Sequence, residues 1–289
     1  MELTDIGEIR ALLSRHGFSF SKGLGQNFLC DAAVPRRIAE ASGADRGTAV
    51  LEIGPGIGCL TRELCLRAGK VVSVELDRRL YPVLGETLAQ CDNFELVPGD
   101  IMRLDLKKLV AERLSGFSRC IVCANLPYNI TSPVLTALIS SSCFDSITVM
   151  IQREVARRIC ARENTADYGA FTVFVQWHCT AQQLFDVPPH CFIPAPRVTS
   201  SVIRLDARPE PPLEVRDESL MFALVRAAFN QRRKTLANAV SSAFGARFSK
   251  EAVADALAQC QLDARIRGEA LNLEQFSRLS DALSEVPLK

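Results

Sequence analysis

Residue types that bind polar ligands recur at the ends of predicted strands. The stretch Leu51-Glu52-Ile53-Gly54-Pro55-Gly56-Ile57-Gly58 joins a predicted strand to a predicted helix. Glycine lets a backbone approach a ligand closely, and a helix N-terminus favours polar or anionic groups. Glu75 ends the next strand, 21 residues after Gly54, where a carboxylate can accept both hydrogen bonds of a ribose diol. The pattern indicates a nucleotide-like ligand; the alternative is a strand-to-helix turn that binds nothing.

A further acid, Asp100, follows Gly99 at the end of the third predicted strand. A carboxylate at that place can accept a hydrogen bond from an adenine amino group, although an aspartate there is also a common turn or capping residue. The glycine spacing is Gly-x-Gly-x-Gly, and Cys59 stands at the sixth position of the dinucleotide fingerprint, where glycine or alanine is typical. The loop therefore favours S-adenosylmethionine over a nicotinamide cofactor, and an NAD oxidoreductase stays as an alternative.

The fourth predicted strand ends in Asn125-Leu126-Pro127-Tyr128. Asn125 offers an uncharged oxygen acceptor, and Pro127 forces Leu126 into an extended conformation that can turn its carbonyl toward a site. Tyr128 adds a flat ring. Two acceptors beside an aromatic face suit a planar substrate that carries an amino group, such as adenine. The alternative is a turn shaped by Pro127 in which Tyr128 only packs.

The elements that must position these residues alternate between strands and helices. Short β-branched apolar runs predict strands at 49–53, 71–76, 93–97, 120–124 and 146–151. Amphipathic segments predict helices at 59–69, 79–91 and 132–142. This alternation predicts an α/β fold with a mostly parallel, Rossmann-like sheet. Two further strands, 181–187 and 200–206, have no helix between them and predict an antiparallel pair at the sheet edge.

A proline-rich stretch, 208–212, predicts a linker, and every later segment is helical in pattern. We therefore expect a catalytic sheet domain at 1–207 and a small all-helical domain at 208–289. Acids are absent from 219–250 and from 9–30, while both stretches carry several basic residues. A charge run is usually a solvated face, but two such stretches make an anionic partner worth considering.

Composition excludes several classes of protein. With 48% hydrophobic and 23% charged residues, the chain has the composition of an ordinary globular protein, and no apolar run is long enough to cross a bilayer. The N-terminal residues contain acids and no long apolar core, so no signal peptide is expected. The 11 cysteines are odd in number and form no zinc set with a neighbouring pair or histidine. A reduced, cytoplasmic, metal-free protein is expected.

Taken together, these motifs resemble the ribosomal RNA adenine N6,N6-dimethyltransferase family, and within it the enzymes of the small ribosomal subunit. The resemblance spans some 210 residues and eight ordered motifs, beginning with Gly-Gln-Asn-Phe-Leu at 25–29. It includes the strand-end motifs described above and continues through Gln-Arg-Glu-Val-Ala at 152–156. It ends with Phe-Ile-Pro-Ala-Pro-Arg-Val at 192–198 and Phe-Asn-Gln-Arg-Arg-Lys-Thr-Leu at 229–236.

The resemblance implies an S-adenosylmethionine-dependent methyltransferase and assigns roles to named residues. The cofactor would be bound by Asn27, Leu29, Gly54, Gly56, Glu75, Asp100, Ile101 and Asn125. The target adenine would be held by Asn125, Leu126 and Pro127 and sandwiched between Tyr128 and Phe192. Phosphates of the RNA would be contacted by Lys22, Arg153, Arg232, Arg233 and Lys234, and no metal is expected.

The implied reaction methylates N6 of two adjacent adenosines in the 3′-terminal hairpin of small-subunit ribosomal RNA. Its substrate would be a pre-assembled small ribosomal subunit, and the enzyme would act as a monomer. Hydrogen bonds from the adenine amino group to the Asn125 oxygen and the Leu126 carbonyl would stabilise the developing positive charge. One alternative is a large-subunit methyltransferase of the macrolide-resistance type. The other is a mainly non-catalytic ribosome assembly factor that binds RNA with the same fold.

Overall fold

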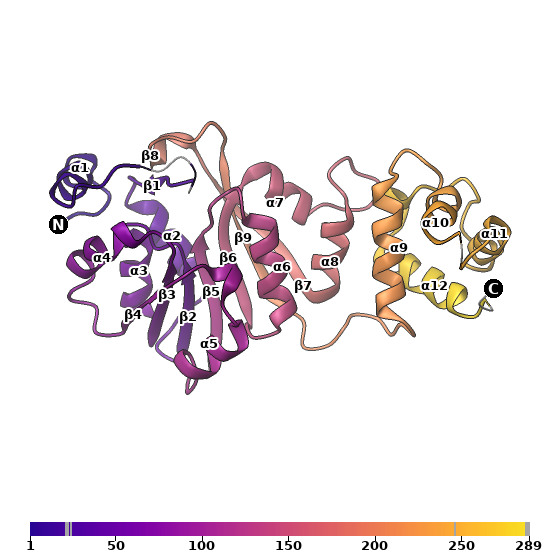
Figure 1. Ribbon diagram of the computed structural model, residues 1–289, viewed down its shortest axis with the longest axis horizontal. Helices are drawn as coiled ribbons and strands as arrows, with labels where there is room; N and C mark the ends of the chain where they lie inside the picture. The colour runs from indigo at the N-terminus through magenta and orange to yellow at the C-terminus, as the bar shows by residue number, and fades with distance from the viewer. Residues whose placement is uncertain (21–22, 24, 246, 287–289) are drawn as a thin grey trace. The chain divides into compact units, whose positions relative to one another are not determined.

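The computed structural model describes residues 1–20, 23, 25–245 and 247–286 of the 289. Within them the chain divides into two compact units, coloured along the chain in Figure 1. The first unit comprises Met1–Ala156 and Ala181–Ala207. The second comprises Arg157–Thr180 and the chain from Arg208 onward.

The first unit is built on a sheet whose strand order, within the described residues, is β4-β3-β2-β5-β6-β9-β7 (Figure 1). Neighbouring strands from β4 through β6 run parallel, whereas β9 runs antiparallel to β6. The predicted fold class is confirmed. The strands are β2 Thr48–Ile53, β3 Lys70–Glu75, β4 Phe94–Pro98, β5 Arg119–Asn125, β6 Ser146–Gln152, β7 Cys179–Val187 and β9 Ser200–Ala207.

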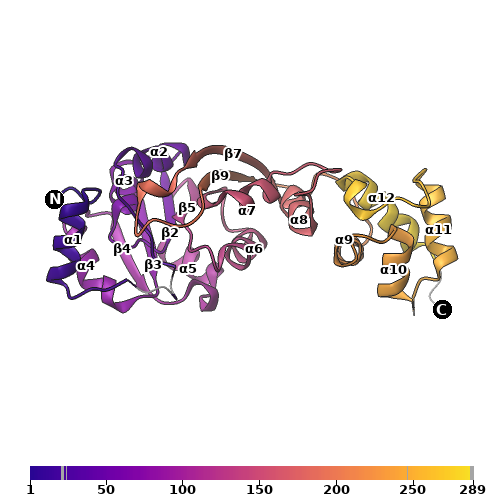
Figure 2. The same cartoon turned by 90° about the horizontal axis from the view of Figure 1, so that it is seen from above.

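The central strands are largely apolar and buried because the sheet is covered on both faces. Every residue of β2 is buried, and so is all of β3 after Lys70. Helices α2 and α3 lie over one face, while α5 and α6 lie over the other (Figure 2). The helices of this part of the chain are α1 Ile6–Arg15, α2 Ala33–Ala41, α3 Cys59–Arg67, α4 Tyr81–Thr87, α5 Leu106–Arg113, α6 Thr131–Ser141 and α7 Arg153–Ile159, with 3₁₀ turns η2 Arg78–Leu80, η3 Ile101–Arg103 and η4 Pro189–Cys191.

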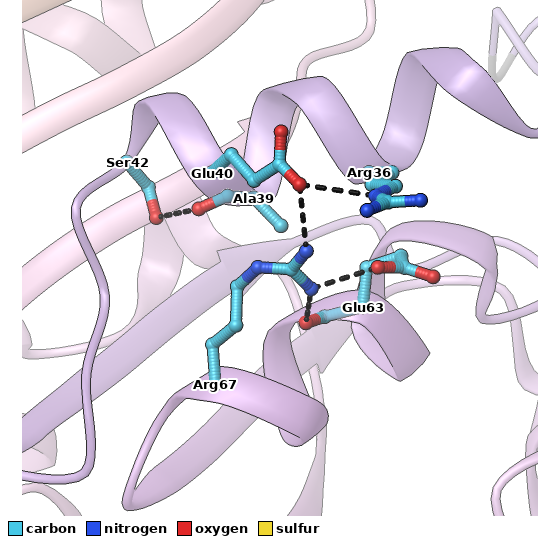
Figure 3. Close-up of polar contacts among 6 residues, drawn as sticks. All are labelled: Arg36, Ala39, Glu40, Ser42, Glu63 and Arg67. Carbon is cyan, nitrogen blue, oxygen red and sulfur yellow. Dashed lines mark hydrogen bonds and ion pairs between the residues drawn. The ribbon is translucent and has the colours of Figure 1, made fainter.

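Helices α2 and α3 are joined by an ion-pair network, which Figure 3 shows in close-up. The guanidinium of Arg67 lies 3.1 Å from a Glu40 oxygen and 2.8 Å from a Glu63 oxygen, and Arg36 lies 3.0 Å from Glu40. These side chains are partly exposed, so each pair contributes at most about 1 kcal/mol. The apolar core beneath α2 and α3 provides most of the stability, and the ion pairs favour one orientation of the two helices relative to each other. Because α3 starts at Cys59, fixing this helix also fixes the glycine loop before it.

A short second sheet closes over the large one. Strand β1, Phe28–Leu29, pairs antiparallel with β8, Phe192–Ile193, with Leu29 opposite Phe192. This pairing joins the predicted Gly-Gln-Asn-Phe-Leu motif to the proline-rich segment although about 160 residues separate them. It places the ring of Phe28 beside Gly56 and the carbonyl of Asn27 within hydrogen-bond distance of Asn125.

The second unit is helical and encloses its own core. Its helices are α8 Ala170–His178, α9 Glu218–Asn230, α10 Leu236–Phe244, α11 Lys250–Gln259 and α12 Leu273–Ser284, with the 3₁₀ turn η5 Gly268–Ala270. The core includes Trp177 from α8, Phe248 and Phe276. The hydroxyl of Tyr168 donates a hydrogen bond of 3.0 Å to the Leu271 carbonyl.

This core corrects the predicted domain limits. The division after residue 207 lies where the linker is expected, but Arg157–Thr180 cluster with the C-terminal helices and not with the sheet. The physical reason is the apolar side of α8, whose Val173 and Trp177 are buried against the later helices. The chain therefore enters the helical unit twice.

Candidate active site

One cavity of the first unit lies at the carboxyl ends of the four neighbouring strands β4, β3, β2 and β5. Chain direction brings these ends together, because parallel strands all finish at the same edge of a sheet. Between β2 and β5 the strand order reverses, and ligands of open α/β sheets bind at such a point. The predicted residues among the cavity lining are Asn27, Leu29, Gly54, Gly56, Glu75, Asp100, Ile101, Asn125, Leu126, Pro127 and Tyr128.

The glycine loop forms the floor of this cavity with a backbone that other residues rarely adopt. Gly54 has φ +68° and Gly56 has φ +61°, both in the left-handed region. A Cβ atom on Gly56 would lie 3.1 Å from two ring carbons of Phe28. A side chain at residue 56 would therefore meet both an unfavourable backbone conformation and the ring of Phe28.

Glu75 and Asp100 present carboxylates at adjacent strand ends. Glu75 is only 6% exposed, and burial raises its pKa above the ordinary value although backbone N–H groups of Asp77 and Gly56 donate to it. The Asp77 N–H lies 2.8 Å from Glu75 Oε1. Asp100 lines the cavity and also accepts the Met102 N–H at 3.0 Å, so it both caps η3 and faces the site. The carboxylate of Glu75 is therefore held in one orientation, whereas the side chain of Asp100 is more exposed to solvent.

A third carboxyl group at the cavity, Glu52, was not assigned a role from the sequence. It is 1% exposed, and its Oε2 accepts hydrogen bonds from the hydroxyls of Thr61 at 2.8 Å and Ser73 at 2.6 Å. Burial raises the pKa of Glu52 to about 7, the two hydroxyls oppose that rise, and the charge of Glu75 adds to it. An acid inside an otherwise apolar buried strand is the signal that identifies this position in the sequence.

Asn125 ends β5, and its side-chain amide is oriented by a hydrogen bond to the segment that precedes β1. Its Nδ2 donates to the carbonyl of Asn27 at 3.4 Å, a contact that joins residues 98 positions apart. Since the nitrogen end of the amide is engaged there, the Oδ1 end is left as the acceptor. The backbone N–H of Leu126 donates to the Met150 carbonyl at 3.1 Å, and the Leu126 side chain is buried. The turn is thereby anchored to β6.

The ring of Tyr128 is fixed from behind. Its hydroxyl lies 2.6 Å from the Ser200 hydroxyl at the start of β9, and the ring lines the cavity. Burial raises the pKa of Tyr128 above its usual value, so the phenol stays protonated at neutral pH. Within the same turn the hydroxyl of Thr131 donates to the carbonyls of Pro127 and Tyr128. The arrangement supplies a flat aromatic surface next to an amide acceptor.

Comparison with known proteins identifies the family. A model of the family described as ribosomal RNA adenine dimethylase matches residues 17–283. The chain is 45% identical over 285 residues to ribosomal RNA small subunit methyltransferase A of Streptococcus gordonii, covering 98% of each protein. This chain belongs to the ribosomal RNA adenine dimethylase family. The predicted family and enzyme class are confirmed.

Solved structures of similar proteins agree with the fold of this adenine dimethylase. A dimethyladenosine transferase of Plasmodium falciparum is 25% identical, with a TM-score of 0.74 over 87% of this chain and 95% of that one. The 23S rRNA methyltransferase ErmE is 28% identical, with a TM-score of 0.68 over 89% of this chain and all of that one. Both similarities extend beyond the sheet, because each covers far more of the chain than the first unit's strands and helices alone.

Phe192 lies elsewhere in this dimethylase than predicted. Its ring was expected to sandwich an adenine with Tyr128, but the side chain is 4% exposed and belongs to the hydrophobic core that includes Leu29 and Cys191. Its strand β8 pairs with β1, so Phe192 lies directly opposite Leu29, which itself lines the cavity. Phe192 in this structure supports the cavity wall and does not form its surface.

The predicted phosphate-binding residues of the dimethylase differ in their surroundings. Arg233 and Lys234 are exposed in the second unit. Arg232 lies 2.6 Å from Glu269 and also donates to the Thr165 carbonyl, while Arg153, in the first unit, lies 3.6 Å from Asp186. Lys22 lies outside the described residues. Within the described part of the chain, Arg233 and Lys234 have no ion pair of this kind to break before they meet a phosphate.

Neither a metal site nor a membrane span is found in the part of the chain that the structure describes. No group of three or more histidine, cysteine, aspartate or glutamate side chains there is arranged to hold a metal ion. No helix among the same residues is long and apolar enough to span a membrane.

Proposed function

We propose that this chain methylates N6 of two adjacent adenosines in the 3′-terminal hairpin of small-subunit ribosomal RNA, giving N6,N6-dimethyladenosine. S-adenosylmethionine is the proposed methyl donor. The observation that supports this most directly is the cavity itself. An amide acceptor with an oriented oxygen, Asn125, lies beside an anchored aromatic ring, Tyr128, across from two carboxylates that suit a nucleoside.

The residues of the cavity fit S-adenosylmethionine. Gly54 and Gly56 allow backbone to approach the ligand, the oriented carboxylate of Glu75 suits a ribose diol, and Asp100 suits an adenine amino group. The proposed binding set also includes Asn27, Leu29, Ile101 and Asn125, all of which line the cavity. When bound there, the cofactor supplies an electrophilic methyl group on a sulfonium.

The chain's own groups then have to make a weak nucleophile react. The exocyclic nitrogen of adenine is a poor nucleophile because its lone pair is delocalised into the ring. Hydrogen bonds from its N–H groups to Asn125 Oδ1 and the Leu126 carbonyl favour a pyramidal nitrogen and stabilise developing positive charge. Pro127 sets the backbone that carries this carbonyl, and Tyr128 stacks on the base, offsetting about 1–3 kcal/mol of the cost of unstacking it.

Proton transfer needs no dedicated base in this scheme. After methyl transfer the nitrogen is strongly acidic and loses a proton to water. The cavity lining contains no histidine among the described residues, and its phenol stays protonated. In this scheme the rate enhancement comes from positioning and electrostatic complementarity.

The small ribosomal subunit is favoured over the large one as the source of the RNA. The Streptococcus gordonii protein named for the small subunit shares 45% identity with this chain, whereas ErmE, named for 23S rRNA, shares 28%. The proposed substrate is a pre-assembled small subunit in the cytoplasm, bound by a monomeric enzyme. Phosphate contacts are proposed for Lys22, Arg153, Arg232, Arg233 and Lys234.

The test replaces the proposed acceptor. Asn125→Ala is expected to reduce methyl transfer to under-methylated small subunits by about 100-fold or more, because one preorganised transition-state contact is lost. Binding of S-adenosylhomocysteine should remain measurable by calorimetry. Asn238→Ala, on the exposed side of α10, is the matched control and should be as active as the native enzyme.

Two results would contradict the proposal. Full activity of Asn125→Ala on small subunits would remove the assigned role of that amide. Preferential methylation of large subunits by the native enzyme, measured by mass mapping of dimethyladenosine, would assign the RNA differently.

A further inference from the structure

Asp77 links two walls of the cavity and has no role in the reaction scheme above. It lies two residues after Glu75 and is 7% exposed. Its backbone N–H donates to Glu75 Oε1 at 2.8 Å, and its own Oδ2 accepts the side-chain N–H of Gln26, also at 2.8 Å. One residue thus contacts both the carboxylate proposed for the ribose and the segment that carries Asn27.

Arg79 strengthens the same connection. Its guanidinium binds both oxygens of Asp77, at 2.9 and 2.6 Å, and its Nη1 donates to the Ser19 carbonyl at 3.1 Å. The guanidinium also lies 4.9 Å from the ring centre of Phe18. The pKa of Asp77 lies below its usual value, chiefly because of Arg79, so the carboxylate remains charged as an acceptor. The N-terminal segment is therefore held at residues 18, 19 and 26.

The segment held in this way forms part of the site. Asn27 accepts the Nδ2 hydrogen bond of Asn125 through its carbonyl, and Leu29 lines the cavity. Phe28 fills the space next to Gly56. A chain of contacts therefore runs from Glu75 through Asp77 and Gln26 to the residue that orients Asn125.

We propose that Asp77 is a positioning residue, which through Gln26 holds residues 25–29 against the cofactor cavity. Asp77 also orients Glu75 through its backbone N–H, so one residue positions both the Glu75 carboxylate and residues 25–29. The inference rests on the proposed function, because it assumes that the cavity binds S-adenosylmethionine. A purely structural alternative exists, since the Asp77 carboxylate also caps η2 by accepting the Arg79 N–H at 3.1 Å.

The experiment removes the side-chain hydrogen-bond donor at residue 26 and then restores it. Gln26→Met keeps the length of the side chain but cannot donate to Asp77, and loss of a hydrogen bond to a charged group should weaken S-adenosylhomocysteine binding about tenfold. The KM for S-adenosylmethionine should rise similarly, while kcat at saturating cofactor changes less than about threefold, because bound ligand helps to hold the segment. Gln26→Lys restores a donor and should bind within about threefold of the native enzyme. In an Asp77→Ala background, Gln26→Lys should give no such recovery.

The controls separate this inference from the function on which it rests. Gln259→Met, an exposed position on α11, should bind like the native enzyme. Native affinity in Gln26→Met, or recovery by Gln26→Lys without Asp77, would overturn the positioning role. A lower melting temperature and a lower kcat with unchanged affinity would also overturn it, in favour of capping alone. Glu75→Gln tests the site itself: if that variant binds S-adenosylhomocysteine normally, the proposed cofactor site is wrong.

Discussion

Glu52 shows how a single buried carboxyl group can make this protein sensitive to pH. The residue is fully enclosed, its two hydroxyl partners donate to one oxygen, and the nearby charge of Glu75 disfavours a second negative charge. Its pKa of about 7 means that the folded protein keeps the proton through much of the range in which an unfolded chain has lost it. A raised folded-state pKa stabilises the fold below the unfolded value near 4.5, and that contribution is lost as pH rises through about 7.

Because stability falls as Glu52 ionises, removing its carboxyl group should make the protein less sensitive to pH. Glu52→Gln should remove the fall in unfolding free energy that Glu52 causes between about pH 4.5 and 7, which is on the order of 3 kcal/mol. At pH 8 the variant should be the more stable of the two. Urea unfolding at several pH values measures this, with Glu210→Gln on the exposed linker as control. Parallel pH profiles for native protein and Glu52→Gln would show that Glu52 is ionised in the fold.

Among the secondary-structure elements, the site depends on how strands end and on the turns that come after them. Strands β2, β3, β4 and β5 each pass into a polar or glycine-rich turn at the same edge of the sheet. The first of these turns is the most constrained, because Gly56 combines a left-handed backbone with the ring of Phe28 at close range. Strand β1 supplies that ring, so the loop and the small sheet must fit each other.

Gly56→Ala should therefore damage the loop in two ways. The methyl group would lie 3.1 Å from the Phe28 ring at a φ of +61°, and we expect a loss of about 1–3 kcal/mol in stability together with weaker S-adenosylhomocysteine binding. Gly85→Ala is the matched control, because Gly85 lies in α4 with ordinary φ and open space around its Cβ position. That control should be stabilised by up to about 1 kcal/mol. Equal melting temperatures for the two variants would contradict the argument.

In the molecule as a whole, each unit has its own core and its own part of the proposed RNA surface. The helical unit contains the adjacent residues Arg232 and Arg233, and both are predicted from the sequence to contact phosphates. Arg232 pairs with Glu269, whose carbonyl in turn accepts the Asn164 N–H at 2.8 Å, so it fastens a loop to η5. Arg233 is exposed. Neighbouring arginines therefore differ in what their loss should change.

Substitution by methionine should separate the two arginines. Arg232→Met is expected to lower stability by about 1 kcal/mol, because a partly exposed ion pair and a backbone contact are lost. Arg233→Met should leave the melting temperature nearly unchanged, weaken small-subunit binding and reduce its salt dependence by about one phosphate contact. Thermal unfolding and binding at several salt concentrations measure both effects. Equal melting temperatures and equal salt dependence of binding for Arg232→Met and Arg233→Met would contradict the different roles given to the two arginines.

The sheet, the order of its strand ends and the residues that gather there could all be predicted from the amino-acid sequence. They depend on local patterns, because apolar alternation defines strands and chain direction brings the carboxyl ends of parallel strands to one edge. The motif at 125–128 could be interpreted in this way, and in the structure it lies beside Gly54, Glu75 and Asp100. Family membership also followed from the order and spacing of the motifs.

Which side chains are exposed and which are buried or paired was decided only by the three-dimensional packing. Phe192 is in the core because β8 pairs with β1, Arg232 is held by Glu269, and α8 belongs to the helical unit through Trp177. The contact between Gln26 and Asp77 joins residues 51 positions apart. Elements that are distant in the sequence set the burial and the partners of each of these side chains. A local sequence pattern does not encode those contacts.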